Sequence, residues 1–140
     1  SLMGVASLYA NPDSVITLAD RYWDANEMDS ARLFYQKGLL AAKESNDTLS
    51  QILGIKGLLN VHRRDRELVD IAEFRETLRN FSGTQHYEAL MRSQVVVGMY
   101  LFQIGKYQES ISHLDSVYQL LSDVAVNTQL MIFGIGLSNV

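Results

Sequence analysis

The chain of 140 residues contains no cysteine and only one proline, Pro12. The absence of cysteine excludes a disulfide framework, a thiolate nucleophile and thiolate metal ligands. It leaves the location open between the cytoplasm, which we favour, and a periplasmic or extracytoplasmic sensor region. Because proline is the residue that most strongly interrupts helices, almost everything after Pro12 can be helical. The sequence therefore favours long helices.

Long apolar runs and an excess of basic residues are missing as well. The longest apolar stretches, around residues 95–102 and 130–137, fall short of the ~20 residues that a membrane-spanning helix needs. The formal net charge of −4 argues against a nucleic-acid-binding domain, which would present a basic face to phosphate. Hydrophobic residues nevertheless make up 47% of the chain, which fits one soluble domain with a core. We expect no membrane insertion and no nucleic-acid binding by this domain.

What is present is a repeat of about 40 residues. Turn-like tripeptides that follow one helical pattern and precede another begin at Asn26, Arg66 and Gly105, at spacings of 40 and 39 residues. Around them, apolar residues recur at three- and four-residue steps, which is typical of amphipathic helices. The last five residues, Gly136–Val140, echo Gly57–Val61 at a distance of 79 residues. A repeating unit of two helices therefore fits the chain.

The phase of the repeat sets the expected boundaries. Helices are predicted at residues 13–25, 28–45, 48–63, 67–81, 84–104, 107–122 and from about 124 onward. They form units at about 13–46, 47–83 and 84–122, with a partial fourth unit at 123–140, and residues 1–12 are expected to be an N-terminal extension. The fourth unit lacks a second helix to cover its apolar side chains. We expect an excerpt from a longer protein, a terminal cap, or a dimer contact at this helix.

These residues resemble the tetratricopeptide repeat, in the longer-helix variants of bacterial regulators and sensor proteins. The matching positions are Val15, Leu18-Ala19, Tyr22, Asn26-x-Met28, Ala31, Tyr35 and Gly38 in unit one, and Val97-Gly98, Leu101, Gly105-x-Tyr107, Ser110, Leu114 and Val117 in unit three. Unit two matches mainly in phase, with His62, Arg66-x-Leu68 and Arg75 at its positions. The resemblance implies an all-α, right-handed superhelix of about three helical hairpins plus a terminal helix, with a concave groove.

In that family the first helix of each unit lines the groove, and the groove binds a protein or peptide. By phase, the positions that face it are Ile16, Asp20, Trp23 and Asp24; Lys56, Asn60, Arg63 and Arg64; and Arg92, Val95, Met99 and Phe102. Trp23 and Phe102 are expected to be apolar anchors, the four basic residues to pair with acidic groups, and Asn60 to hold the ligand backbone. In the alternative interpretation these side chains are solvated, Trp23 fills the core, and the arginines offset a helix dipole.

No residues suited to catalysis or to holding a metal or cofactor stand out. The three histidines, His62, His86 and His113, are far apart in sequence and lack the spacing of a helical zinc site. We expect a non-enzymatic protein-interaction module without cofactors, acting as the docking or sensing part of a larger bacterial regulatory or signal-transduction protein. The alternative is a self-association module that dimerises through its apolar C-terminal helix, with Leu130, Met131, Ile132, Phe133 and Ile135 in the contact.

Overall fold

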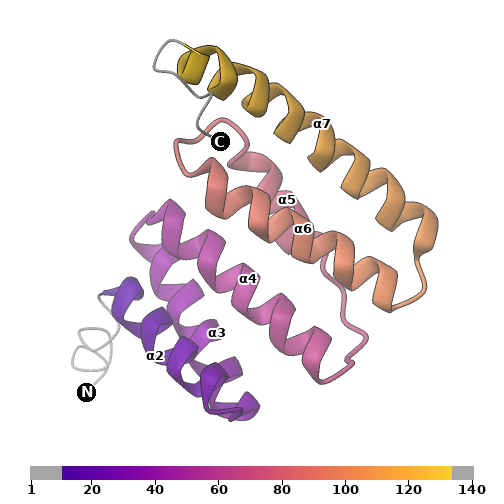
Figure 1. The fold of residues 1–140 in the computed structure, drawn as a ribbon. Coiled ribbons are helices and arrows are strands. Elements are labelled where there is room, and N and C mark those ends of the chain that lie inside the picture. The colour runs from indigo at the N-terminus through magenta and orange to yellow at the C-terminus, as the bar shows by residue number, and fades with distance from the viewer. Residues whose placement is uncertain (1–10, 134–140) are drawn as a thin grey trace.

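The computed structural model describes residues 11–133, and for residue 121 and residues 124–133 it describes the helical backbone only. Within this part the chain is all-helical and contains no strand (Figure 1). The helices are α2 (Pro12–Asp24), α3 (Met28–Glu44), α4 (Thr48–Arg64), α5 (Ala72–Asn80), α6 (Tyr87–Gln103) and α7 (Tyr107–Phe133).

The helices pack as neighbouring hairpins. α2 packs on α3, α4 packs on both of them, α6 packs on α4, and α7 packs on α6 (Figure 1). The short α5 contacts α6. As a result the first helices of the three predicted units, α2, α4 and α6, follow one another across the molecule, and α7 lies at its edge.

Four helices end in the same way. The residues after α2, α3, α4 and α6 include one left-handed residue each: Asn26, Asn46, Arg66 and Gly105, with φ of 60°, 55°, 54° and 86°. In each case the next residue donates a backbone hydrogen bond back into the last helical turn, as Glu27 does to Tyr22 O at 2.9 Å. This geometry is the Schellman motif, which satisfies the free carbonyl groups of a helix end. The turns predicted at Asn26, Arg66 and Gly105 are thus confirmed.

Two helix starts have side-chain caps. Asn11 accepts a hydrogen bond from Ser14 N at 3.3 Å and places Pro12 in the first turn of α2. Asp47 accepts from Ser50 N at 3.0 Å and from the Ser50 hydroxyl at 2.9 Å. Capping of this kind satisfies donors that the helix itself leaves free. The cap of α2 is Asn11, so the helix begins at Pro12, one residue before the predicted start at residue 13.

The core lies where the hairpins meet, and glycines let the helices approach there. Ile16 is only 3% exposed, and an added Cβ at Gly38 of α3 would lie 2.6 Å from its Cγ1. On α4, a Cβ at Gly57 would overlap the ring of Tyr35, which is itself buried. The sequence prediction that Ile16 faces a groove is therefore wrong, because its side chain fills the space above Gly38.

The helix predicted at residues 67–81 is shorter than expected. α5 begins at Ala72, and residues 67–71 form an irregular segment before it. The fully buried Tyr100 of α6 explains this: its hydroxyl accepts from Val69 N at 2.8 Å and donates to Glu67 O at 2.9 Å. These backbone groups are satisfied by a side chain instead of by a helical turn. The next helix, predicted from residue 84, begins at Tyr87.

The end of the chain also differs from the prediction. A helix over 107–122 and a separate one from about 124 were expected, but α7 is one continuous helix of 27 residues. Residues 122–126 are Ser-Asp-Val-Ala-Val, with no glycine, proline or asparagine to end a helix. Of the residues proposed for self-association, Leu130, Met131, Ile132 and Phe133 lie where only the backbone is described, and Ile135 lies outside the described residues.

Arg75 connects α5 to α7 through polar contacts. Its guanidinium group pairs with Glu109 and lies 3.4 Å from His113 Nδ1. His113 Nε2 lies 2.8 Å from Gln94 O, and because a carbonyl only accepts, the proton is on Nε2. Burial lowers the pKa of His113; the hydrogen bond to Gln94 opposes this shift, and the charge of Arg75 adds to it. The imidazole therefore links α6 and α5 in its neutral form.

Candidate protein-binding groove

The strongest candidate site lies where the C-terminal ends of α4 and α6 meet. α4 ends in His62, Arg63 and Arg64, and basic residues in the last turn are favoured by the helix dipole. Gln103 Nε2, at the end of α6, donates to Arg63 O at 2.8 Å and fixes the two helix ends relative to each other. The local sequence thus places several guanidinium groups beside the end of α6.

These ends enclose an open hollow of about 610 Å³, which we call the basic groove. Its lining combines three arginines with apolar side chains: Arg63, Arg64, Arg66, Met99, Phe102, Gln103 and Leu114. Two of the apolar side chains are exposed, Phe102 by 61% and Met99 by 41%. The Phe102 ring meets Tyr107 edge-on at 5.1 Å, so it has a fixed position although it faces solvent.

The charges around the basic groove are separated by sign. The nearby carboxylates of Asp65 and Glu67 both pair with Arg32 of α3, the first at 2.6 Å. Arg63, Arg64 and Arg66, by contrast, have no ion-pair partner among residues 11–133. The guanidinium groups of this groove therefore keep their capacity to bind an anionic group.

Neutral groups hold two of these arginines in place. Arg64 Nη2 donates to Asn26 Oδ1 at 2.6 Å, and its guanidinium carbon lies 5.5 Å from the centre of the Trp23 ring. Arg63 Nη1 donates to Asn60 Oδ1 at 3.1 Å, while its buried Nε has no acceptor. The guanidinium group of Arg64 is thus held by a neutral acceptor and an aromatic ring, and that of Arg63 by a neutral acceptor alone.

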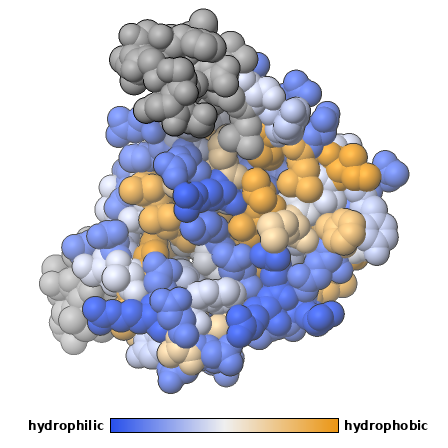
Figure 2. Space-filling view, viewed as in Figure 1, coloured by the Kyte–Doolittle hydropathy of each residue, from blue (hydrophilic) through white to orange (hydrophobic). Residues whose placement is uncertain are grey.

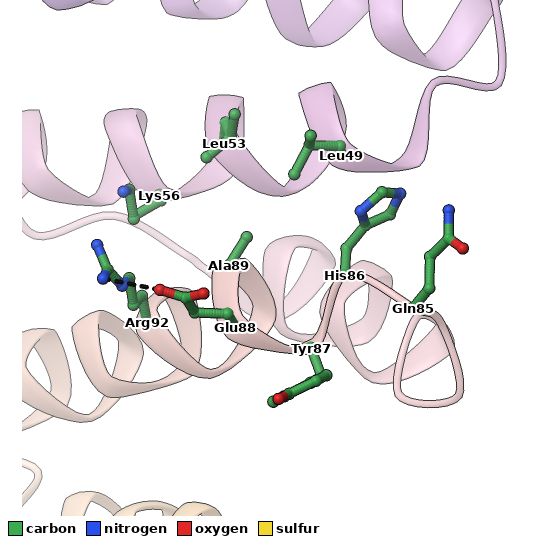
Figure 3. Close-up of a pocket in the computed structure, with 9 residues that line it drawn as sticks. All are labelled: Leu49, Leu53, Lys56, Gln85, His86, Tyr87, Glu88, Ala89 and Arg92. Atoms are coloured by element: carbon green, nitrogen blue, oxygen red, sulfur yellow. Dashed lines mark hydrogen bonds and ion pairs between the residues drawn. The ribbon is translucent and has the colours of Figure 1, made fainter.

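A second hollow, of about 380 Å³, lies between the N-terminal halves of α4 and α6 (Figure 3). Lys56 of α4 and Arg92 of α6 lie across the gap from each other, and Arg92 pairs with Glu88 of its own helix at 2.9 Å. His86 points toward α4, whereas Tyr87 points away from it. The α4–α6 boundary is thus basic at both of its ends.

The seven residues that were predicted to contact a ligand are distributed over these two places. Arg63, Arg64 and Phe102 line the basic groove, with Trp23 beneath Arg64 and Asn60 bonded to Arg63. Lys56 and Arg92 line the second hollow. Trp23 is half-buried and packs against the core, so it fills inter-helix space and contacts Arg64 at once.

Sequence reasoning did not place Arg66, Gln103 or Leu114 in the groove. Arg66 lies in the turn after α4, where helical phase no longer indicates a direction. Leu114 belongs to α7, a second helix of its unit, and reaches this face because it packs over Gly98 of α6. The turn-like tripeptide that begins at Arg66 was the one sequence signal that could have indicated the position of this side chain.

Other classes of site find little support among the described residues. No group of three or more histidine, aspartate or glutamate side chains in residues 11–133 is arranged to hold a metal ion. Tyr35 donates a hydrogen bond to Asp20, and its burial, followed by this hydrogen bond, raises the pKa of the hydroxyl above its ordinary value. Tyr35 is therefore a neutral structural group between α2 and α3.

Within the same residues, no helix has the length and apolar character required to cross a membrane. Comparison of the whole chain with models of known families, with curated proteins and with solved structures yields no match.

Proposed function

We propose that this chain is a protein-interaction module that binds an acidic and apolar peptide segment in the basic groove between α4 and α6. The observation that supports this is the set of three arginines without carboxylate partners beside the exposed side chains of Met99 and Phe102. The resemblance to tetratricopeptide repeats adds that such a module would serve as the docking or sensing part of a larger bacterial regulatory protein. The proposal includes no catalytic residue and no cofactor.

The chemistry of the groove supports this choice of ligand. Exposed apolar rings bind large apolar side chains, which exclude water from the neighbouring charges. A carboxylate next to such a side chain can then accept two hydrogen bonds from one guanidinium group. Each hydrogen bond to a charged group contributes roughly 1.5–3 kcal/mol. The expected ligand therefore carries aspartate or glutamate adjacent to leucine, phenylalanine or a similar residue.

Selection from a random phage-displayed peptide library on the immobilised chain tests this proposal. Selected peptides should be enriched in an acidic residue next to a large apolar one. Their affinity, measured by fluorescence anisotropy, should fall at least about tenfold for Arg63→Glu and for Phe102→Ser, since tenfold corresponds to roughly 1.4 kcal/mol.

The matched control is Arg21→Glu, because Arg21, like Arg63, lies in the last turn of a helix, but it is exposed and lines neither hollow. It changes the net charge equally and should leave peptide affinity unchanged. Selection of peptides without acidic residues, or equal affinity for all the variants, would contradict the proposal.

A further inference from the structure

Arg32 of α3 holds both of the carboxylates that lie beside the basic groove. Its Nη2 donates to Asp65 Oδ2 at 2.6 Å and also pairs with Glu67 Oε1. The three side chains are 28%, 33% and 31% exposed, so the cluster is partly shielded from solvent. Arg32 itself lines neither hollow and therefore does not contact a ligand held there.

The order of charges along the chain gives this contact a consequence for the groove. Asp65 stands between Arg64 and Arg66, and Glu67 follows Arg66. An arginine side chain is long and presents five donors, so it can reach a free carboxylate on a neighbouring residue. Within residues 11–133, Asp65 has no ion-pair partner other than Arg32. Without Arg32, the groove arginines would be the cations available to both carboxylates.

The backbone of this turn does not depend on Arg32. Asp65 N and Glu67 N donate to Val61 O and His62 O, each at 2.9 Å. Residue 66 adopts the left-handed φ of 54° between them. These bonds satisfy the end of α4 by themselves. Removal of the Arg32 side chain should therefore redirect the two carboxylates and leave the turn in place.

The apolar half of the groove is independent of this cluster. Figure 2 shows hydrophilic side chains gathered over the end of α4, next to apolar ones over α6. Met99 and Phe102 are exposed on α6, and a change in the direction of Asp65 or Glu67 leaves them so. Loss of Arg32 should thus remove the preference of the groove for charge while its apolar contacts remain.

We propose that Arg32 is a positioning residue that makes the basic groove selective for acidic ligands, by holding Asp65 and Glu67 away from the groove arginines. With Arg32 in place, an arriving carboxylate meets guanidinium groups that have no carboxylate partner. Without it, Asp65 and Glu67 compete with the ligand, and a competing surface ion pair lowers affinity about fivefold. The inference rests on the proposed function of the groove and adds the residue that sets its preference for charge.

A cycle of four proteins tests this coupling. They are the wild type, Arg32→Met, the amide variant Asp65→Asn/Glu67→Gln, and the triple variant that combines all three changes. Affinity for a fluorescein-labelled peptide of alternating glutamate and leucine is measured by fluorescence anisotropy. Arg32→Met should bind about fivefold more weakly, and the triple variant should regain at least wild-type affinity. A peptide of alternating glutamine and leucine should bind the wild type and Arg32→Met equally.

Lys43→Met is the matched control. Lys43 also lies on α3 and pairs at 3.1 Å with a carboxylate, that of Glu73, which lines neither hollow. The control removes the same charge and should leave affinity unchanged. If Arg32 served only the fold, the triple variant would not recover; if only total charge mattered, Lys43→Met would bind as weakly as Arg32→Met. Either result would overturn the proposal.

A second measurement needs no ligand. Phenylglyoxal modifies arginine side chains, and pairing with a carboxylate slows this reaction. Modification of Arg63, Arg64 and Arg66, followed by mass spectrometry, should slow in Arg32→Met and recover in the triple variant. Unchanged rates would overturn the role of Arg32. Rates that change as expected, without binding of the acidic peptide to the wild type, would instead contradict the proposed function.

Discussion

Gly57 shows how closely the fold depends on single residues. Its missing side chain leaves room for the buried ring of Tyr35, whose hydroxyl is bonded to Asp20. In a helix, Gly→Ala ordinarily stabilises by about 0.5–1 kcal/mol. Here the added methyl group would displace an aromatic ring, and overpacking of that kind costs about 1–3 kcal/mol.

We therefore predict that Gly57→Ala lowers the free energy of unfolding, measured by urea denaturation. Gly83→Ala is the control, because an added Cβ at Gly83 meets no atom within 4 Å. The control should be neutral or slightly stabilising. Equal stability of the two variants would show that Tyr35 moves aside without cost.

His113 gives stability a dependence on pH. Its pKa is lowered in the folded state, chiefly by burial and further by Arg75 and Arg79, while the hydrogen bond to Gln94 and the charge of Glu109 oppose the shift. The unfolded chain thus binds a proton more readily than the folded one as pH falls below about 6.5. The contribution of His113 to the free energy of unfolding is therefore present above that pH and is lost as the pH falls below it.

The melting temperature of the wild type should therefore fall between pH 7.5 and 5.5 by more than that of His113→Gln. The variant keeps a donor for Gln94 O but cannot take up a proton. Thermal denaturation followed by circular dichroism at both pH values provides the comparison. Parallel changes in the two proteins would exclude this role of His113.

Single residues also mark the limits of the sequence analysis. Helical phase placed Arg63, Arg64 and Phe102 on one side of the molecule, and the structure brings them to one groove. The same phase put Ile16 on that side, whereas it is buried. Helical phase indicates the direction in which a side chain points, but it does not give the distance to the next helix. That distance depends on residues such as Gly38, whose contact with Ile16 can be seen only in the structure.

At the scale of elements, the segment between α4 and α5 depends on one hydroxyl group. Tyr100→Phe would leave Val69 N without its acceptor, and a buried donor without a partner costs about 1–3 kcal/mol. We predict that the variant loses stability by about that amount and is cleaved faster by trypsin after Arg66. Tyr87→Phe, at an exposed tyrosine, is the control. Unchanged cleavage in Tyr100→Phe would show that other contacts hold the segment.

Helix ends were predictable where a turn residue marks them and not elsewhere. Asn26 and Gly105 end helices as expected, because their residue types tolerate left-handed geometry. The start of α5 was missed because the contact that delays it comes from Tyr100, about 30 residues away in sequence. For α7, the repeat suggested a break, but the local sequence contains no residue that ends a helix, and the local sequence prevailed.

At the scale of the whole molecule, α4 is the central element. It contacts α2, α3 and α6, and its side chains at Ile52, Ile55, Leu59 and Val61 are fully buried. α5, in contrast, buries Leu78 alone. Amide hydrogen exchange should therefore be slowest in α4 and fastest, among α2–α6, in α5, because local opening exposes less surface there. Mass spectrometry of exchanged peptides measures this order, and uniform exchange across the helices would contradict it.

The polar outer side of α2 limits how large an assembly this chain can form. Surfaces that pair head to tail lead to open filaments, whereas a surface that pairs only with its own counterpart stops growing after two copies. Within residues 11–133, Arg21 is exposed on the outer side of α2, whereas the exposed apolar side chains of Ile111 and Tyr118 lie on α7. These two surfaces do not complement each other, so raising the protein concentration should not produce fibres or gels.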